Sequence, residues 1–317
     1  RQRQMCIRDS LKNLPTMNDV YKKKVELLLR ILPFVTDEEC FAIHGGTAIN
    51  LFVKNLNRLS VDIDVTYLPL EDRATSLKYI NEALMRIADK TKRSFSDIRV
   101  ISRLDICKIT CERQGCQVKI EVNQTKRGLV CGEARLYPLC EKAQRLFGME
   151  VDARIVSLSQ LYGGKISAAL SRQHPRDLFD VKQMDIPLSE VKDGIIYCLL
   201  GSDRPIHESF SPNFIDQREA MENQFVGMSD IPFSYEEFEM TRNKLIKGVN
   251  DIMTEADKRF LVSYEELTVN REESPYSMFF DFPSVKWKIQ NLQKLKTTNP
   301  RKLKAEANKL RLILGIE

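Results

Sequence analysis

The chain has 317 residues, of which 43% are hydrophobic and 29% are charged. These are the proportions of a soluble globular protein, and the length suits one large domain or two ordinary ones. No apolar run is long enough to cross a bilayer and no secretory signal pattern begins the chain, so we expect no membrane association and a cytoplasmic location.

Hydrophobic spacing predicts a chain of mixed helices and strands up to about residue 200, and helices after it. The chain begins with RQRQMCIRDS, and we expect residues 1–16 to be a non-native or disordered flank. The predicted elements are a helix at 18–34, strands at 40–43 and 60–68, helices at 47–55 and 73–91, a strand pair within 103–125, two helices within 157–184, a loop at 201–214, and helices over 234–267 and the C-terminal segment. The sequence therefore predicts an α+β domain over 17–200 and a helical domain over 201–317.

Two local features refine this outline. Thr47 is expected to be the N-cap of the helix at 47–55, because a threonine hydroxyl can accept a hydrogen bond from the first turn. Pro175 suits the first turn of the second helix in 157–184, where its missing N–H costs nothing.

The C-terminal segment 286–311 carries nine basic residues against one acidic residue, while the whole chain has a net charge of +5. A solvated helix face and a binding surface for a polyanion, above all RNA, are about equally supported by this composition.

The cysteines offer a weaker candidate for a site. Cys107, Cys111 and Cys116 fall close together in the predicted strand pair, but the eight cysteines include no C-x-x-C pair and the chain has three histidines. Reduced, mostly buried thiols are therefore a better account than a metal site.

Two aspartates stand in the predicted strand at 60–68. Residues two apart on a strand face the same way, so Asp62 and Asp64 project together while Val61, Ile63 and Val65 face the core. A hard cation such as Mg²⁺ would relieve the repulsion between two neighbouring carboxylates. The alternative is a solvated strand face that happens to carry two acids.

Other residues fit the same site. Gly45 and Gly46 lie between a strand and a helix, where backbone N–H groups and the Thr47 hydroxyl would cradle a phosphate. Glu121 points the same way on its own strand as the aspartate pair would need, and it is a candidate third metal ligand. Arg58 is a candidate to hold a carboxylate or a phosphate, and Ser60 stands beside it or simply begins the strand.

A second charged group lies in the helical segment GGKISAALSRQHPRDLFDV. Lys165, Arg172 and Arg176 recur near one helical stripe, although Pro175 interrupts it. Asp177 and Asp180 are three residues apart and share a face. Cations beside carboxylates suit a polyphosphate clamp, and an ordinary network of salt bridges is the alternative.

Together, the G-G-T turn, the spacing to Arg58-x-Ser60-x-Asp62-x-Asp64 and this helical segment resemble the AbiEii/AbiGii toxin nucleotidyltransferases of the DNA polymerase β-like superfamily. The resemblance implies a nucleotidyltransferase-like mixed sheet with flanking helices, followed by a helical C-terminal domain. It implies catalytic roles for Asp62, Asp64, Lys165 and Asp177, nucleotide binding by Gly45, Gly46, Thr47, Arg58, Ser60, Lys165 and Arg176, metal binding by Asp62, Asp64 and Glu121, and support from Arg172 and Asp180.

The expected activity is metal-dependent transfer of NMP from an NTP to an acceptor hydroxyl, with Mg²⁺ or Mn²⁺ as the metal and GTP as one candidate substrate. RNA, and tRNA first, is the expected acceptor. The resemblance also implies a toxin of a toxin–antitoxin or abortive-infection system, with a cognate antitoxin as a partner. A protein or small-molecule acceptor, and a non-catalytic GTP- or RNA-binding module, are the alternatives.

Overall fold

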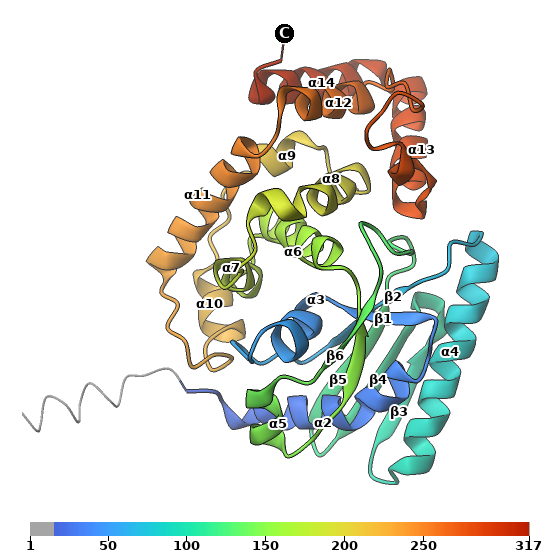
Figure 1. Ribbon diagram of the computed structural model, residues 1–317, viewed down its shortest axis with the longest axis vertical. Coiled ribbons are helices and arrows are strands. Elements are labelled where there is room, and N and C mark those ends of the chain that lie inside the picture. The colour runs from blue at the N-terminus through green and yellow to red at the C-terminus, as the bar shows by residue number, and fades with distance from the viewer. Residues whose placement is uncertain (1–15, 317) are drawn as a thin grey trace, which may run out of the picture.

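The computed structural model describes residues 16–316 and shows a seven-stranded mixed sheet below a group of helices (Figure 1). The predicted flank 1–16 therefore lies outside the described residues except at its last position. The strand order is β3-β4-β5-β2-β1-β7-β6. The strands are β1 (Phe41–His44), β2 (Ile63–Tyr67), β3 (Arg99–Arg103), β4 (Lys108–Arg113), β5 (Cys116–Val122), β6 (Arg135–Pro138) and β7 (Asp152–Ile155).

The centre of the sheet sets the position of the acidic residues. β2 pairs antiparallel with β1 and parallel with β5, and in this register Asp64 lies opposite His44 on one side and Glu121 on the other. Ile63 and Val65 are buried on the opposite face, as the alternation predicts. The pleat therefore turns Asp64 and Glu121 to the same face of the sheet.

Two long helices pack against the strands. α2 (Asp19–Thr36) contacts β1, β5 and β7, and α4 (Arg73–Ser94) runs along β3 and β4. Each begins with a side-chain cap: Asn18 accepts a hydrogen bond from the N–H of Val20, and Asp72 accepts one from the N–H of Thr75. Both helices were predicted, and each extends two or three residues past its predicted end.

The segment after β1 differs from the prediction. The helix begins at the glycines, as α3 (Gly45–Thr47), and continues as a π-helix over Ala48–Val53. Thr47 is therefore inside the helix and is not its N-cap. Its hydroxyl donates to the backbone carbonyl oxygen of Asp62, because α3 packs directly on the chain that enters β2. β2 itself starts at Ile63, so Asp62 precedes the strand that was expected to contain it.

Several short elements were not predicted: β3, β6, β7 and α5 (Glu141–Phe147). The expected loop at 201–214 also contains a short helix, α9 (His207–Phe210). β6 and β7 have four residues each, which is too short for a periodic pattern to show in the sequence.

Helices dominate after β7. The two predicted helices of 157–184 are α6 (Leu158–Arg172) and α7 (Pro175–Lys182), with Pro175 at the first turn as expected. The rest are α8 (Lys192–Leu200), α10 (Arg218–Gln224), α11 (Tyr235–Asp251), α12 (Glu255–Glu265), α13 (Pro283–Thr298) and α14 (Pro300–Leu314), with 3₁₀ turns at Leu188–Val191 and Ser277–Asp281. Another 3₁₀ turn, Leu104–Ile106, joins β3 to β4. α6 and α7 lie between the sheet and the outer helices (Figure 1).

The basic segment forms α13 and α14, but only part of its charge faces solvent. Lys288 is buried and donates to the backbone oxygen of Arg204, and Arg311 pairs with Glu266. Five of the exposed cations lie around the turn between the two helices: Lys294, Lys296, Arg301, Lys302 and Lys304.

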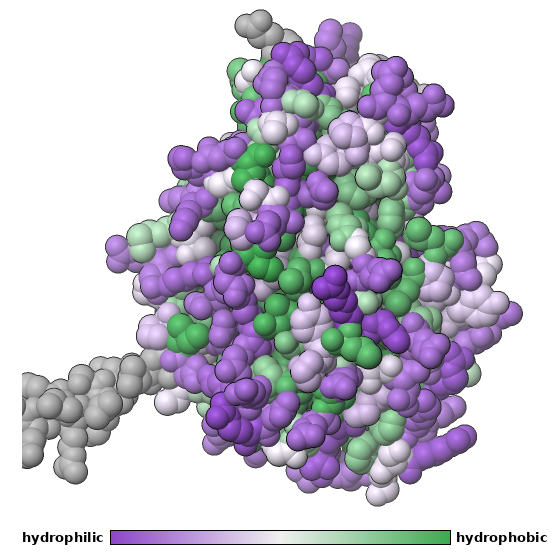
Figure 2. Space-filling view, viewed as in Figure 1, coloured by the Kyte–Doolittle hydropathy of each residue, from purple (hydrophilic) through white to green (hydrophobic). Residues whose placement is uncertain are grey.

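Hydrophilic side chains cover most of the face in Figure 2, and hydrophobic ones form small patches on it. Within residues 16–316, no helix is long and apolar enough to cross a membrane. One hydrophobic core runs through both the sheet and the helical part. The boundary near residue 200 stays a prediction.

Candidate active site

A cavity of about 380 Å³ lies where α3, the ends of β2 and β5, and helices α6 and α7 meet. We call it the carboxylate cleft. Its lining contains every predicted site residue except Thr47 and Asp180. The lining residues are His44, Gly45, Gly46, Arg58, Ser60, Val61, Asp62, Asp64, Lys119, Glu121, Gly164, Lys165, Ala168, Arg172, Arg176 and Asp177. Segments that are distant in the sequence therefore form one surface.

The glycine turn allows the backbone to pass close to charged side chains. Gly45 has a φ of +68°, which disfavours other residues, and a Cβ there would collide with the Asp64 carboxylate. A Cβ on Gly46 would lie 2.6 Å from the Arg58 guanidinium. The glycine turn therefore packs closely against Asp64 on one side and Arg58 on the other.

Thr47 holds the turn in place. Its buried hydroxyl donates to the backbone oxygen of Asp62 and lies 3.1 Å from the hydroxyl of Ser60. The Thr47 hydroxyl was expected to face a phosphate. It instead fastens α3 to the chain that carries the aspartates, because the helix begins two residues earlier than predicted.

Asp64 is in an environment that disfavours its negative charge. Burial, followed by the neighbouring Asp62 carboxylate, raises the pKa of Asp64 to about 6. A divalent cation bound between Asp62 and Asp64 would reverse both effects, and carboxylate oxygens are the ligands that Mg²⁺ prefers. The donor set and its excess negative charge therefore fit a divalent metal.

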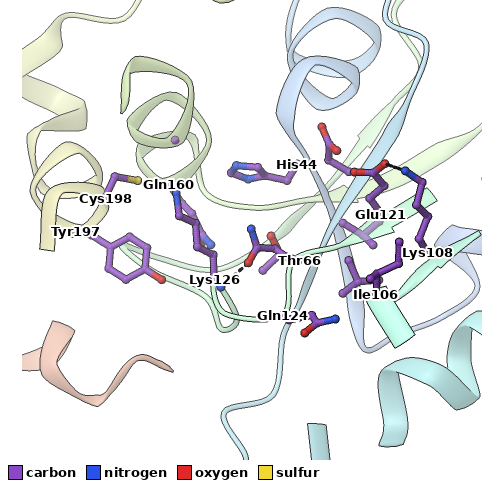
Figure 3. Close-up of a pocket in the computed structure, with 15 residues that line it drawn as sticks. His44, Thr66, Ile106, Lys108, Glu121, Gln124, Lys126, Gln160, Tyr197 and Cys198 are labelled. Atoms are coloured by element: carbon purple, nitrogen blue, oxygen red, sulfur yellow. Dashed lines mark hydrogen bonds and ion pairs between the residues drawn. The ribbon is translucent and has the colours of Figure 1, made fainter. Parts of the chain in front are cut away.

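Glu121 is adjacent to Asp64 but is engaged elsewhere. The two residues are register partners, yet the Glu121 carboxylate pairs with Lys108 at 2.5 Å (Figure 3). Across residues 16–316, no three His, Cys, Asp or Glu side chains are arranged to hold a metal ion. Glu121 therefore lines the cleft, but it is not grouped with other side chains that could bind a metal. Its role as third ligand stays a prediction.

Arg58, Lys165, Arg172 and Arg176 form what we call the basic wall of the cleft. Asp180 holds two of these cations, Arg58 and Lys165, in place. It accepts hydrogen bonds from Arg58 at 2.8 and 2.6 Å and from Asn50 at 2.9 Å, and it pairs with Lys165 at 3.0 Å. Arg58, Lys165 and Asp180 are all almost fully buried. These contacts favour the supporting role expected for Asp180, that of a positioning residue.

Asp177, which lines the cavity itself, also holds cations of the basic wall in place. It pairs with Lys165 at 2.9 Å and accepts two hydrogen bonds from Arg172. Burial pushes the pKa of Asp177 upward, but the two cations outweigh it and hold that pKa well below its usual range. Asp177 therefore stays ionised and holds two cations against the cleft.

Arg176 differs from the other cations. It lines the cleft, and no ion pair in the described part of the chain involves its guanidinium. Burial and the nearby Arg58 lower its pKa. An anion in the cleft would supply the missing counter-charge.

Three polar residues that line or support the cleft were not predicted. Asn50 bridges Asp180 and the backbone oxygen of Gly46, and Lys119 and His44 line the cleft. Lys119 was detectable, because it lies two residues before Glu121 on the same strand face. The position of Asn50 depends on contacts between distant segments, which spacing does not reveal.

Comparisons with known proteins identify the family and the fold. The family model described as nucleotidyl transferase AbiEii toxin, type IV toxin–antitoxin system, matches residues 26–193, which is more than half of the chain. The fold is similar to that of MenT4, a nucleotidyltransferase toxin from Mycobacterium tuberculosis H37Rv, with a TM-score of 0.57 and 13% identity over 84% of this chain and 91% of that chain. No curated protein matches the sequence. The chain therefore belongs to the AbiEii family of nucleotidyltransferase toxins of type IV toxin–antitoxin systems.

Proposed function

We propose that this nucleotidyltransferase transfers NMP from an NTP to a hydroxyl of an RNA acceptor, in a reaction that requires Mg²⁺ or Mn²⁺. One observation carries the proposal: a glycine turn, a pair of aspartates and a set of cations line a single cavity. Each of these three groups matches one part of the reaction.

The basic wall suits the triphosphate. Lys165, Arg172 and Arg176 line the cleft from α6 and α7, together with the glycine turn. Lys165 and Arg172 are held by Asp177, so their ammonium and guanidinium groups are already oriented before a nucleotide binds. Preoriented cations stabilise the charge that develops on a leaving pyrophosphate.

Asp62 and Asp64 would hold the divalent metal, with Glu121 joining them once Lys108 releases it. A metal bound there would offset the charge of the phosphates and help activate the attacking hydroxyl. In the reaction the acceptor oxygen forms a bond to the α-phosphorus, and the bond from that phosphorus to the bridging oxygen breaks. Pyrophosphate leaves with the electron pair, and the hydroxyl proton passes to a neighbouring carboxylate.

The acceptor is proposed from the charge of the protein surface. Exposed lysines and arginines cluster at the turn between α13 and α14, and such clusters attract the phosphate backbone of RNA. A tRNA 3′ end is the first candidate, and GTP is one candidate nucleotide. We also propose a cognate antitoxin as partner, on the ground of family membership.

Transfer of label from α-labelled NTPs to cellular fractions tests the proposal. Purified protein is incubated with each NTP and with total RNA, total protein or a small-molecule extract, next to the Asp64→Ala variant. We expect label in RNA for the wild type and none for the variant. Label in protein or in small molecules would favour the other acceptors, and NTP binding without transfer to any fraction would favour a non-catalytic module.

A further inference from the structure

A second cavity of about 500 Å³ lies between the first turn of α4 and the first turn of α13, apart from the aspartate pair. We call it the tryptophan cavity. Its lining residues are Leu70, Glu71, Asp72, Arg73, Gln124, Thr125, Arg127, Asp281, Pro283, Lys286, Trp287 and Gln290. The mechanism above uses none of them.

Arg127 is the first observation that points to a ligand. Its side chain is only 3% exposed, and its Nε atom has no hydrogen-bond partner. Its guanidinium donates to the backbone oxygen of Asp72 over a long 3.4 Å, and no ion pair within residues 16–316 includes it. A buried guanidinium without an acid is costly, and an anion in the cavity would supply the missing acceptor.

Of the described residues, none of the acidic ones around the tryptophan cavity forms an ion pair with Arg73 or Arg127, although Glu71 and Asp72 lie close enough for their charges to act on Arg127. Glu71 accepts a hydrogen bond from the Tyr67 hydroxyl at 2.8 Å, and Asp72 caps α4. Asp281 pairs with Arg271 at 2.7 Å and lies 3.9 Å from Lys286.

A second arginine of the cavity is also without an acid. Arg73 donates to the amide oxygen of Gln124, which is a neutral partner. Arg73 and Arg127 are therefore both available to a phosphate.

Trp287 is the second observation. Its side chain is 53% exposed, next to Leu70 at 52%, and it lines both the tryptophan cavity and the neighbouring cavity. In the described part of the chain, no ring or cation stacks on its indole. An open aromatic face beside phosphate-binding cations is the arrangement that binds single-stranded nucleic acid, in which bases stack and phosphates pair.

A third cavity, of about 550 Å³, connects this surface to the carboxylate cleft. It shares Gly164, Ala168 and Arg172 with the cleft, and Thr125 and Trp287 with the tryptophan cavity. Hydroxyl and amide side chains supply much of its lining. The loop 123–127 borders it and follows directly from β5.

We infer that the tryptophan cavity binds a nucleotide of a single-stranded RNA acceptor, a short distance before the reacting 3′ end. Its phosphate lies against Arg127 and Arg73, and its base stacks on Trp287. The strand then follows the third cavity to the aspartates. This inference rests on the proposed RNA acceptor, and it adds the residues that hold the RNA.

The chain offers a direct probe, because Trp287 is its only tryptophan. Full-length protein is titrated with a single-stranded RNA oligonucleotide in EDTA and without NTP, while tryptophan fluorescence is recorded. We expect saturable quenching by the single strand, and little quenching by a blunt duplex or by an NTP alone. Since no metal or NTP is present, RNA binding is measured independently of transfer.

Labelled RNA and fluorescence anisotropy give the affinities of variants. We expect Trp287→Ala to raise the Kd for RNA at least about fivefold and Trp287→Phe to raise it less, because phenylalanine still stacks. Arg73→Gln should reduce the slope of log Kd against log salt by about 0.7, the loss of one phosphate contact on a single strand. Lys247→Gln, which removes an exposed lysine on α11, is the matched control and should leave the slope unchanged.

Three results would overturn the inference. They are no quenching by single-stranded RNA, equal quenching by NTP alone, and an Arg73→Gln variant that behaves like Lys247→Gln. Failure of the proposed function has a different signature. In that case RNA binding is normal in these titrations, but no label enters RNA in the transfer assay.

Discussion

The negative charge of Asp64 lowers the stability of the metal-free protein, and the same carboxylate has a role in the proposed reaction. Its pKa of about 6 means that the folded protein holds a proton on this carboxyl more tightly than the unfolded chain does. Stability of the metal-free protein is therefore lost as the pH rises from about 4 to about 6, and the loss is complete above that. Such a cost is typical of sites that are completed by a cation.

Asp64→Asn is predicted to raise the stability of the metal-free protein and to abolish transfer. At pH 7.5 in EDTA the free energy of unfolding should increase by about 1–3 kcal/mol, because the unfavourable charge is gone. The gain should shrink as the pH falls toward 5. Urea unfolding at several pH values measures it, with Asp89→Asn, an exposed carboxyl on α4, as the control. A variant less stable than the wild type at pH 7.5 would show that the Asp64 charge is not unfavourable.

Asp180 has the opposite effect on stability, since it neutralises buried cations. Asp180→Ala leaves Arg58 and Lys165 short of a partner in a buried site. We predict a loss of about 3–5 kcal/mol in the free energy of unfolding. Asp185→Ala removes a salt bridge to Lys54 whose aspartate is 77% exposed, and it should cost less than about 1 kcal/mol. Equal effects of the two substitutions would mean that Asp180 does not hold the basic wall.

Among the elements, the glycine turn determines how closely α3 approaches β2. Gly45→Ala is predicted to reduce transfer by at least about 100-fold, because the new methyl group would displace the Asp64 carboxylate. Gly115→Ala is a matched control: Gly115 also has a positive φ, but a Cβ there would meet nothing within 4 Å. Both variants should lose about 1 kcal/mol of stability through backbone strain, and only the first should lose activity. Steady-state transfer rates and urea unfolding separate the two effects.

Elements whose pattern is local can be predicted from the sequence. The strict alternation around Asp64 and the helical spacing of α2, α4 and α6 each arise from burial of one face, so these elements were found. β6 was missed because Leu136 is 69% exposed and no alternation marks the strand. Most of the charged residues of the cleft were predicted as a set. The pairing of Lys165 with both Asp177 and Asp180 was not predicted, since it depends on how α6 packs against α7.

In the molecule as a whole, the site is formed by two regions together: the centre of the sheet and the helices α6 and α7. β2 and the residues just before it contribute the aspartates, and α3 lies between β1 and β2 along the chain. α6 and α7 contribute Lys165, Arg172 and Arg176, and a neighbouring cavity extends from the cleft to Trp287 on α13. The charge of the basic segment is also divided in the structure. Lys288 and Arg311 have partners within the protein, and most of the exposed cations lie near the turn between α13 and α14.

The proposed reaction of the carboxylate cleft is nucleotidyl transfer assisted by a divalent metal. Parallel reactions of the wild-type protein with RNA and an NTP labelled on either the α- or the γ-phosphate test it. We predict that the α-label enters RNA, that the γ-label leaves in pyrophosphate, and that EDTA or the Asp64→Asn substitution stops both. Entry of the γ-label into RNA, or transfer that persists in EDTA, would contradict this mechanism.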